Sequence, residues 1–180
     1  MRTSIPLLAF LSLAVAQAPA PIIDVGNAKY QGIVSAATNI SNYYGIRYAA
    51  APVGDLRFRA PQDPPALAGV QKATVKQQQC LQGRGGGEDC LFLNVHFPGS
   101  TVPTCLLPVV VWIHGGGYLI GGAASWNGGD LISEAKNGVV AVIIQYRLGV
   151  FGFLAGSQVK ANGALNAGLR EYSPATTYHS

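Results

Sequence analysis

Residues 108–122 read PVVVWIHGGGYLIGG, and this stretch decides the fold. Its first part, 109–113, is an unbroken run of β-branched and aromatic residues, which predicts a strand buried on both faces of a parallel sheet. The run ends at His114, and three consecutive glycines, 115–117, follow. Because glycine has no Cβ, such a loop lets another molecule approach its backbone N–H groups closely. The loop is therefore a candidate anion site.

Three explanations of the glycine loop compete. The first is a glycine-rich turn at a strand end. The second is a dinucleotide-binding loop with the pattern G-x-G-x-x-G, but the residue at the last position is Ile120 and the next glycine is Gly121. The third is the HGGG-type loop of lipases and esterases, whose N–H groups stabilise the oxyanion of a tetrahedral acyl intermediate. The third pattern fits letter for letter, and we favour it.

The residues after the loop predict a parallel crossover. Residues 130–136 suit a short helix that ends near Gly138, and 139–145 form a second apolar run of strand length. Strand, glycine loop, helix and strand in this order form a βαβ unit. The fold class is therefore α/β, and we expect helices on both faces of the sheet.

The amino-terminal half predicts antiparallel strands. Within 22–34, two apolar runs flank a turn at 24–29, which indicates a small antiparallel hairpin. Further strands are expected at 44–48 and 91–97. The connection between these two strands contains several prolines, which indicate an irregular extended path.

Residues 1–16 have the features of a signal peptide. Arg2 supplies the positive charge, an apolar run follows, and Ala14-Val15-Ala16 is an A-x-A cleavage site. The run is too short to span a bilayer, and no other stretch reaches that length. We therefore expect a secreted, extracellular protein with no membrane span. Asn39-Ile40-Ser41 is then a candidate N-glycosylation site at Asn39.

The composition excludes one class of partner. The formal net charge is +4, but the basic residues are dispersed and only Arg57 and Arg59 lie close together. Nucleic-acid binding needs a basic patch or stripe, so no nucleic-acid partner is expected. The chain is 49% hydrophobic and 11% charged, against about 25% charged in a usual domain. Such a composition is typical of the central piece of a larger protein.

The three cysteines suggest one disulfide. Cys80 and Cys90 flank a glycine-rich loop, and in a secreted chain a bridge between them is favoured. Cys105 is then a free thiol, an error in the sequence, or half of a bridge to something absent. No histidine lies at ligand spacing from the cysteines, so no metal site is expected.

Four stretches, in this order, resemble the amino-terminal part of the type-B carboxylesterase and lipase family. They are YYGIRYAAAPVGDLRFRAP (43–61), EDCLFLNV (88–95), PVVVWIHGGGYLIGG (108–122) and QYRLGVFGFLAG (145–156). This family belongs to the α/β-hydrolases. The resemblance implies an incomplete α/β-hydrolase fold for the domain at 17–169, small-molecule carboxylic ester substrates and no cofactor.

The resemblance also assigns roles to residues of this chain. The N–H groups of Gly116 and Gly117 are expected to be oxyanion-hole donors, and His114 begins the motif without being the general base. Two pairs and one arginine are expected to be structural: the disulfide of Cys80 and Cys90, the ion pair of Arg57 and Glu88, and Arg147.

The resemblance stops at Leu169. No G-x-S-x-G nucleophile motif occurs in the printed sequence. Residues 170–180 are expected to be an unrelated tail, and one hypothesis is a translated, unspliced intron. One codon choice for Arg170, Glu171 and Tyr172, CGT GAG TAT, contains GTGAGT, a usual intron start.

Two functions remain open at this point. The first is a secreted carboxylic ester hydrolase, of which this chain supplies the oxyanion hole but neither nucleophile, acid nor histidine, so that the chain alone is inactive. The second is a non-catalytic secreted binding protein, a truncated paralogue of the same family.

Overall fold

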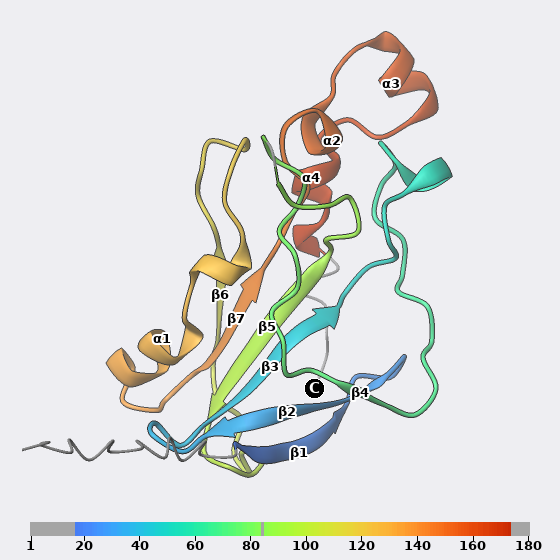
Figure 1. The fold of residues 1–180 in the computed structure, drawn as a ribbon. Coiled ribbons are helices and arrows are strands. Elements are labelled where there is room, and N and C mark those ends of the chain that lie inside the picture. Colours follow the sequence, from blue (N-terminus) through green and yellow to red (C-terminus); the bar gives the residue numbers. More distant parts are fainter. Residues whose placement is uncertain (1–16, 84, 174–180) are drawn as a thin grey trace, which may run out of the picture.

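The computed structural model describes residues 17–83 and 85–173 (Figure 1). The elements follow in this order: β1 (Ala18–Asp24), β2 (Lys29–Ser35), β3 (Ile40–Arg47), the 3-10 helix η1 (Gly54–Leu56), β4 (Val70–Lys72), β5 (Phe92–Pro98), β6 (Val109–Ile113), the 3-10 helix η2 (Ala123–Ser125), α1 (Gly128–Glu134), β7 (Val140–Ile144), α2 (Gly149–Phe153), α3 (Ser157–Asn162) and α4 (Ala167–Arg170). The predicted signal peptide lies outside the described residues.

One mixed sheet organises these elements. Its strand order is β1-β2-β3-β5-β7-β6, with β4 paired to β2. The strands from β1 to β7 pair antiparallel along this path, and β6 pairs parallel to β7, from Val109 opposite Val140 to Ile113 opposite Ile144. The predicted amino-terminal hairpin and the parallel crossover through α1 are both confirmed. The fold class is α/β, as predicted.

The prediction that β6 is buried on both faces is wrong. Val109 is 57% exposed, Val110 38% and Ile113 42%. The reason is its place in the sheet, because β6 pairs with β7 on one side and with no strand of the described residues on the other. The apolar run is typical of a buried strand, but the described residues leave Val109, Val110 and Ile113 exposed.

We expected helices on both faces of the sheet, but the helices of the described residues do not cover both faces. Helix α1 packs against β5 and β7. Helices α2, α3 and α4 gather beyond one end of the central strands (Figure 1). A main core of large apolar and aromatic side chains lies on the sheet, and a smaller cluster of Ile40, Ile132 and Ala141 lies under α1.

Strand β3 begins four residues before its predicted start at residue 44, because polar side chains in it are buried and hydrogen-bonded. The Ser41 hydroxyl donates to the carbonyl of Gly99 at 2.7 Å. Asn42 donates to the carbonyl of Ile40 at 2.8 Å, and its Oδ1 lies 2.7 Å from Nδ1 of His96. Polarity in this segment therefore does not mean exposure.

His96 on β5 is buried under the start of α1. A Cβ on Gly128 would lie only 2.2 Å from the ring, so the helix packs directly on the imidazole. Burial, with a smaller contribution from Lys76, lowers the pKa of His96 to about 4. Its Nε2 has no hydrogen-bond partner among the described residues, so a second ring proton would be unsatisfied.

We predict that His96 makes folding stability fall with acid. Because its folded pKa lies below the unfolded value of about 6.5, the stabilisation is present above pH 6.5 and is lost as the pH falls towards 4. The loss amounts to about 3 kcal/mol at 1.36 kcal/mol per pKa unit. Denaturant unfolding of the parent chain and of His96→Gln from pH 7 to pH 4 tests this, and parallel pH curves would contradict it.

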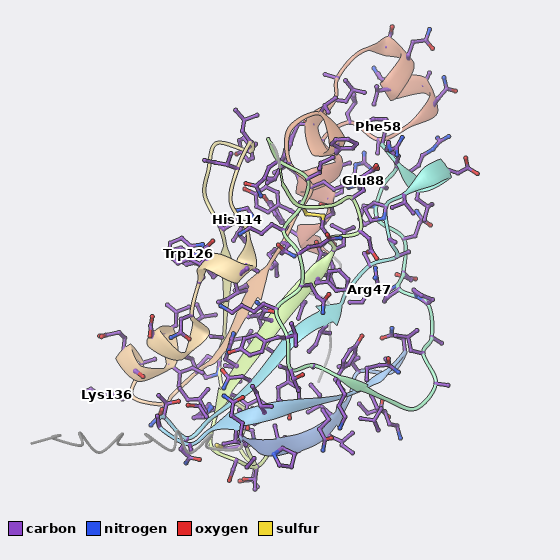
Figure 2. The ribbon with its side chains drawn as sticks, in the orientation of Figure 1. Arg47, Phe58, Glu88, His114, Trp126 and Lys136 are labelled. Carbon is purple, nitrogen blue, oxygen red and sulfur yellow. A yellow bond between two sulfur atoms is a disulfide. The ribbon has the colours of Figure 1, made fainter. Side chains whose placement is uncertain are left out.

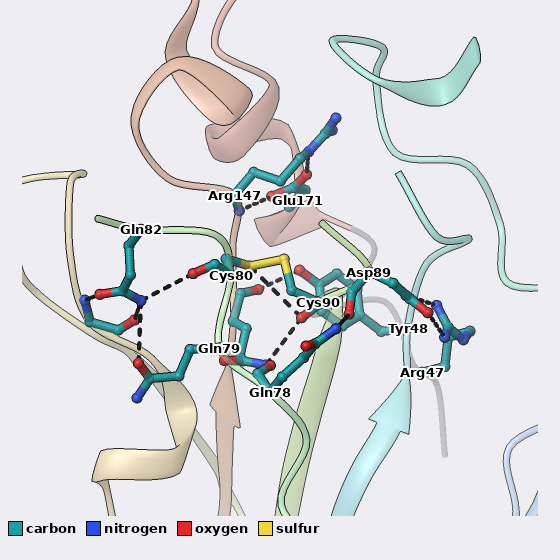
Figure 3. The surroundings of a disulfide bond; sticks show 12 residues. Arg47, Tyr48, Gln78, Gln79, Cys80, Gln82, Asp89, Cys90, Arg147 and Glu171 are labelled. Atoms are coloured by element: carbon teal, nitrogen blue, oxygen red, sulfur yellow. Dashed lines mark hydrogen bonds and ion pairs between the residues drawn. A yellow bond between two sulfur atoms is a disulfide. The ribbon is translucent and has the colours of Figure 1, made fainter. Parts of the chain in front are cut away.

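A buried ion pair holds the segment after α4 to the residues after β7. Arg147 is 2% exposed and Glu171 is 0% exposed. Glu171 accepts hydrogen bonds from Nε and from the backbone N–H of Arg147 (Figure 3). Nη2 of Arg147 donates to the carbonyl of Arg59. Removing one partner leaves an uncompensated buried charge.

We expect Glu171→Ala to lower the free energy of unfolding by about 3–5 kcal/mol, because it leaves Arg147 buried and unpaired. The control is Lys29→Ala, which breaks the exposed pair of Lys29 and Asp24 and is expected to cost under about 1 kcal/mol. Urea denaturation compares the two variants. Equal losses would show that burial of the Arg147 pair carries no special weight.

Candidate active site

The glycine loop leaves the end of β6 in a conformation that requires glycine. Gly116 has φ +124° and Gly117 has φ +61°. A Cβ on Gly116 would lie 1.9 Å from the carbonyl oxygen of Ile120, whereas a Cβ on Gly117 would meet nothing within 4 Å. Gly116 is therefore required by a close backbone approach, and Gly117 only by its left-handed backbone.

Hydrogen bonds within and below the loop hold its shape. The carbonyl of Gly116 accepts from the N–H groups of Leu119 at 3.1 Å and Ile120 at 3.2 Å. The N–H of Gly149, at the start of α2, donates to the carbonyl of Tyr118 at 2.7 Å. The loop is thus closed on itself and tied to the segment after β7.

The N–H groups of Gly116 and Gly117 are the candidate donors. Both glycines are exposed, and neither N–H donates to an acceptor within residues 17–83 and 85–173. Unpaired N–H groups next to each other on a constrained loop suit an anionic oxygen.

His114 supports the loop from below. Its ring is 3% exposed and stacks on Tyr146 with centroids 4.4 Å apart. The Tyr146 hydroxyl donates to the carbonyl of His114 at 2.9 Å, and Nδ1 of His114 lies 2.9 Å from the carbonyl of Gly115. Burial lowers the pKa of His114, with the Gly115 hydrogen bond opposing this effect. These contacts give His114 a packing role.

The disulfide loop, which Cys80 and Cys90 close, lies beside the glycine loop, which runs from Gly115 to Gly121. Cys80 and Cys90 are joined by a disulfide with their Cα atoms 4.9 Å apart, and both are buried (Figure 3). The Gln82 side chain, two residues after Cys80, contacts Gly121 at the end of the glycine loop. Figure 2 shows His114 and Glu88 towards the same end of the sheet, away from Lys136.

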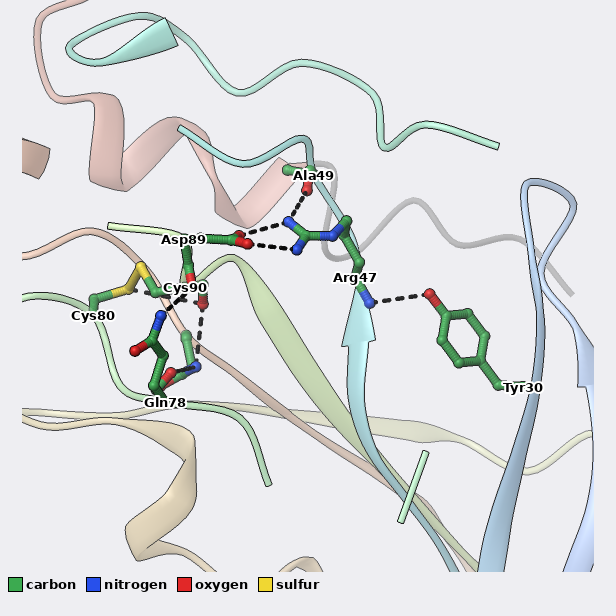
Figure 4. A network of polar contacts seen from close by, with 8 residues as sticks. Tyr30, Arg47, Ala49, Gln78, Cys80, Asp89 and Cys90 are labelled. Carbon is green, nitrogen blue, oxygen red and sulfur yellow. Dashed lines mark hydrogen bonds and ion pairs between the residues drawn. A yellow bond between two sulfur atoms is a disulfide. The ribbon is translucent and has the colours of Figure 1, made fainter. Parts of the chain in front are cut away.

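Two adjacent acidic residues each pair with an arginine. Nε of Arg57 lies 2.5 Å and Nη2 2.7 Å from the carboxylate of Glu88, and this hydrogen bonding raises the pKa of Arg57. Arg47 makes a second two-fold contact, with Asp89, at 2.7 and 2.8 Å (Figure 4). Sequence reasoning missed this second pair, although the charge of Asp89 beside Glu88 was a possible signal.

An open pocket lies between the two loops and α2. Its volume is about 430 Å³, and no described residue in its wall carries a charge. The wall consists of Leu81, Gln82, Gly83, Leu119, Ile120, Leu148, Gly149, Val150 and Phe151. Such a lining suits an uncharged, apolar group.

The remaining residues singled out in the sequence lie apart from this site. Asn39 is exposed, in the turn between β2 and β3. Cys105 is an exposed free cysteine. No helix within residues 17–83 and 85–173 has the length and apolar character needed to cross a membrane.

Comparison with known proteins identifies the family. The model of the carboxylesterase family matches residues 19–175, beyond Leu169, where the resemblance seen in the sequence ends. The chain is 30% identical to secreted lipase 1 of Botryotinia fuckeliana (strain B05.10), with 92% of this chain and 36% of the relative covered. It is 34% identical to lipase 2 of Geotrichum candidum, with 93% and 36% covered.

A solved structure agrees with the sequence relatives. EstA of Aspergillus niger is 42% identical and superposes with a TM-score of 0.79, with 87% of this chain and 31% of EstA covered. This chain thus spans about a third of the length of the proteins it matches. It belongs to the carboxylesterase family of α/β-hydrolases, of which it matches an amino-terminal portion.

Proposed function

We propose that this chain is the oxyanion-hole portion of a secreted carboxylic ester hydrolase. The observation that carries the proposal is the pair of exposed, unpaired N–H groups of Gly116 and Gly117, held on a loop that only glycine can form. Membership of the carboxylesterase family supports it. The uncharged pocket beside the loop supports a neutral ester as the substrate.

The chemistry of ester hydrolysis explains why the loop needs these donors. When a nucleophile attacks an ester carbonyl, negative charge develops on the carbonyl oxygen. Two fixed N–H groups stabilise that oxygen without rearranging, and each is worth about 3–4 kcal/mol of transition-state stabilisation. Such a reaction also needs a serine on a G-x-S-x-G motif, an acid and a histidine. The printed sequence contains no G-x-S-x-G motif.

The first prediction from this proposal concerns the chain alone. Purified residues 17–180 are expected to show no turnover of p-nitrophenyl butyrate, because the chain has no nucleophile elbow. Burst kinetics from this chain would contradict the missing-nucleophile part of the proposal. Binding of a partner without any ester turnover, in the longest natural product of the gene, would favour the non-catalytic binding protein instead.

A second prediction concerns the donors in the longest natural product that continues past Leu169 into a G-x-S-x-G motif. Gly116→Ala is expected to lower kcat by about 100-fold to 1000-fold, because the Cβ would clash with Ile120 and displace one donor. Gly115→Ala is the matched control, since Gly115 is not an assigned donor, a Cβ there meets nothing within 4 Å, and its φ is not positive, so kcat is expected to stay close to the parental value. Equal kcat values in parent and Gly116→Ala would overturn the assignment.

The messenger RNA of this gene tests the nature of residues 170–180. We propose that these residues are an unspliced intron or another unrelated tail, although Glu171 is buried against Arg147 and the family model matches through residue 175. Sequencing of the messenger RNA across the codon of Leu169 decides the question. A genomic sequence without GTGAGT at the codons of 170–172 would rule out this intron hypothesis.

A further inference from the structure

We propose that Gln82 is the positioning residue of the glycine loop, fixing its closed form so that Gly116 and Gly117 present their N–H groups together. This inference rests on the proposed oxyanion role of those two glycines. Gln82 lies in the disulfide loop, outside the glycine loop, and touches neither of the two donors. It acts through Gly121.

The Gln82 side chain forms a two-point contact with one residue. Its Oε1 accepts from the N–H of Gly121 at 2.8 Å, and its Nε2 donates to the carbonyl of Gly121 at 2.6 Å. Nε2 also donates to the carbonyl of Cys80 at 3.1 Å (Figure 3). The amide thus satisfies the donor and the acceptor of Gly121 at once, as a neighbouring strand would. Only a side chain with one donor and one acceptor on the same group can do this.

Close packing carries the position of Gly121 to the donors. A Cβ on Gly121 would lie 2.5 Å from Nδ1 of His114 and 2.6 Å from the carbonyl oxygen of Gly115. Gly116 in turn lies against the carbonyl of Ile120, the residue before Gly121. The end of the loop therefore packs closely against its first residues, so a shift of Gly121 would also move Gly115 and Gly116.

The disulfide gives Gln82 a fixed base. Cys80 is 2% exposed and Cys90 is 0% exposed, so the bridge sits in the core. Nε2 of Gln145, directly after β7, donates to the carbonyl of Cys90 at 3.1 Å and to that of Gln78 at 2.8 Å. The contact of Gln82 with Gly121, which we call the clamp, therefore links the disulfide and the sheet to the exposed glycine loop.

Amide hydrogen exchange in the isotope-labelled chain, residues 17–180, tests the clamp without needing catalysis. The reporters are the amides of Leu119 and Ile120, which donate to Gly116 and do not touch Gln82. In Gln82→Leu we expect their exchange to accelerate by about 10-fold to 100-fold, because two hydrogen bonds are lost and the loop opens locally. The matched control is Gln71→Leu, on β4, which removes the hydrogen bond from the Gln71 side chain to the carbonyl of Ala68.

A second variant distinguishes positioning from general damage. In Gln82→Glu at neutral pH, a carboxylate oxygen faces the carbonyl of Gly121 and repels it, so the reporters should exchange fast. Below the pKa of the new carboxyl group, its O–H can donate to that carbonyl as the amide does. Protection, corrected for the intrinsic pH dependence of exchange, should then return to the parental value.

Each outcome decides the proposal. Parental exchange of Leu119 and Ile120 in a folded Gln82→Leu would overturn it, as would an exchange in Gln82→Glu that is equally fast on both sides of the carboxyl pKa. If Gln82→Leu fails to fold, the Gln82→Glu comparison still decides. Failure of this clamp leaves the ester-hydrolase proposal intact, because that proposal is judged by turnover and by Gly116→Ala.

Discussion

Three consecutive residues directly after β7 hold the segments that make the site. Gln145 bonds to the disulfide loop at Cys90, Tyr146 stacks on His114 and donates to its carbonyl, and Arg147 pairs with Glu171. Strand β7, which these residues follow, lies between β5 and β6, where antiparallel pairing changes to parallel pairing. Contacts from this one short segment therefore reach three parts of the chain that are distant in sequence.

The site follows from that arrangement. The parallel pair of β6 and β7 brings the glycine loop and the start of α2 to the same end of the sheet, where the N–H of Gly149 bonds to Tyr118. The disulfide loop reaches the same end through β5 and contacts Gly121 through Gln82. Two segments outside the exposed loop thus hydrogen-bond to it, one at Tyr118 and one at Gly121. Rigidity is what an oxyanion site needs, since its donors must not reorganise during the reaction.

Local patterns predicted much of the chain, and they failed where burial depends on distant partners. The run at 109–113 predicted β6 with its observed bounds, because β-branched residues determine strand formation locally. The same run did not predict an edge strand, because exposure depends on what covers it. Ser41 and Asn42 lie before the predicted strand start at residue 44 but are buried in β3, where side-chain hydrogen bonds satisfy them. The ion pair of Arg47 and Asp89 was missed because 42 residues separate its partners in sequence.

The sequence by itself determined the amino-terminal hairpin, the strands β5, β6 and β7, the crossover, the glycine loop and the family resemblance, since these depend on side-chain branching, glycine content and short motifs. Only the tertiary structure decided that Gly116 packs against the carbonyl of Ile120 and that Arg147 pairs with Glu171 in the core. It also decided that the Gln82 side chain bonds to both the N–H and the carbonyl of Gly121. Those facts depend on the distances between segments that the sheet brings together. No local pattern encodes such distances, because they arise only when β5, β7 and β6 are paired.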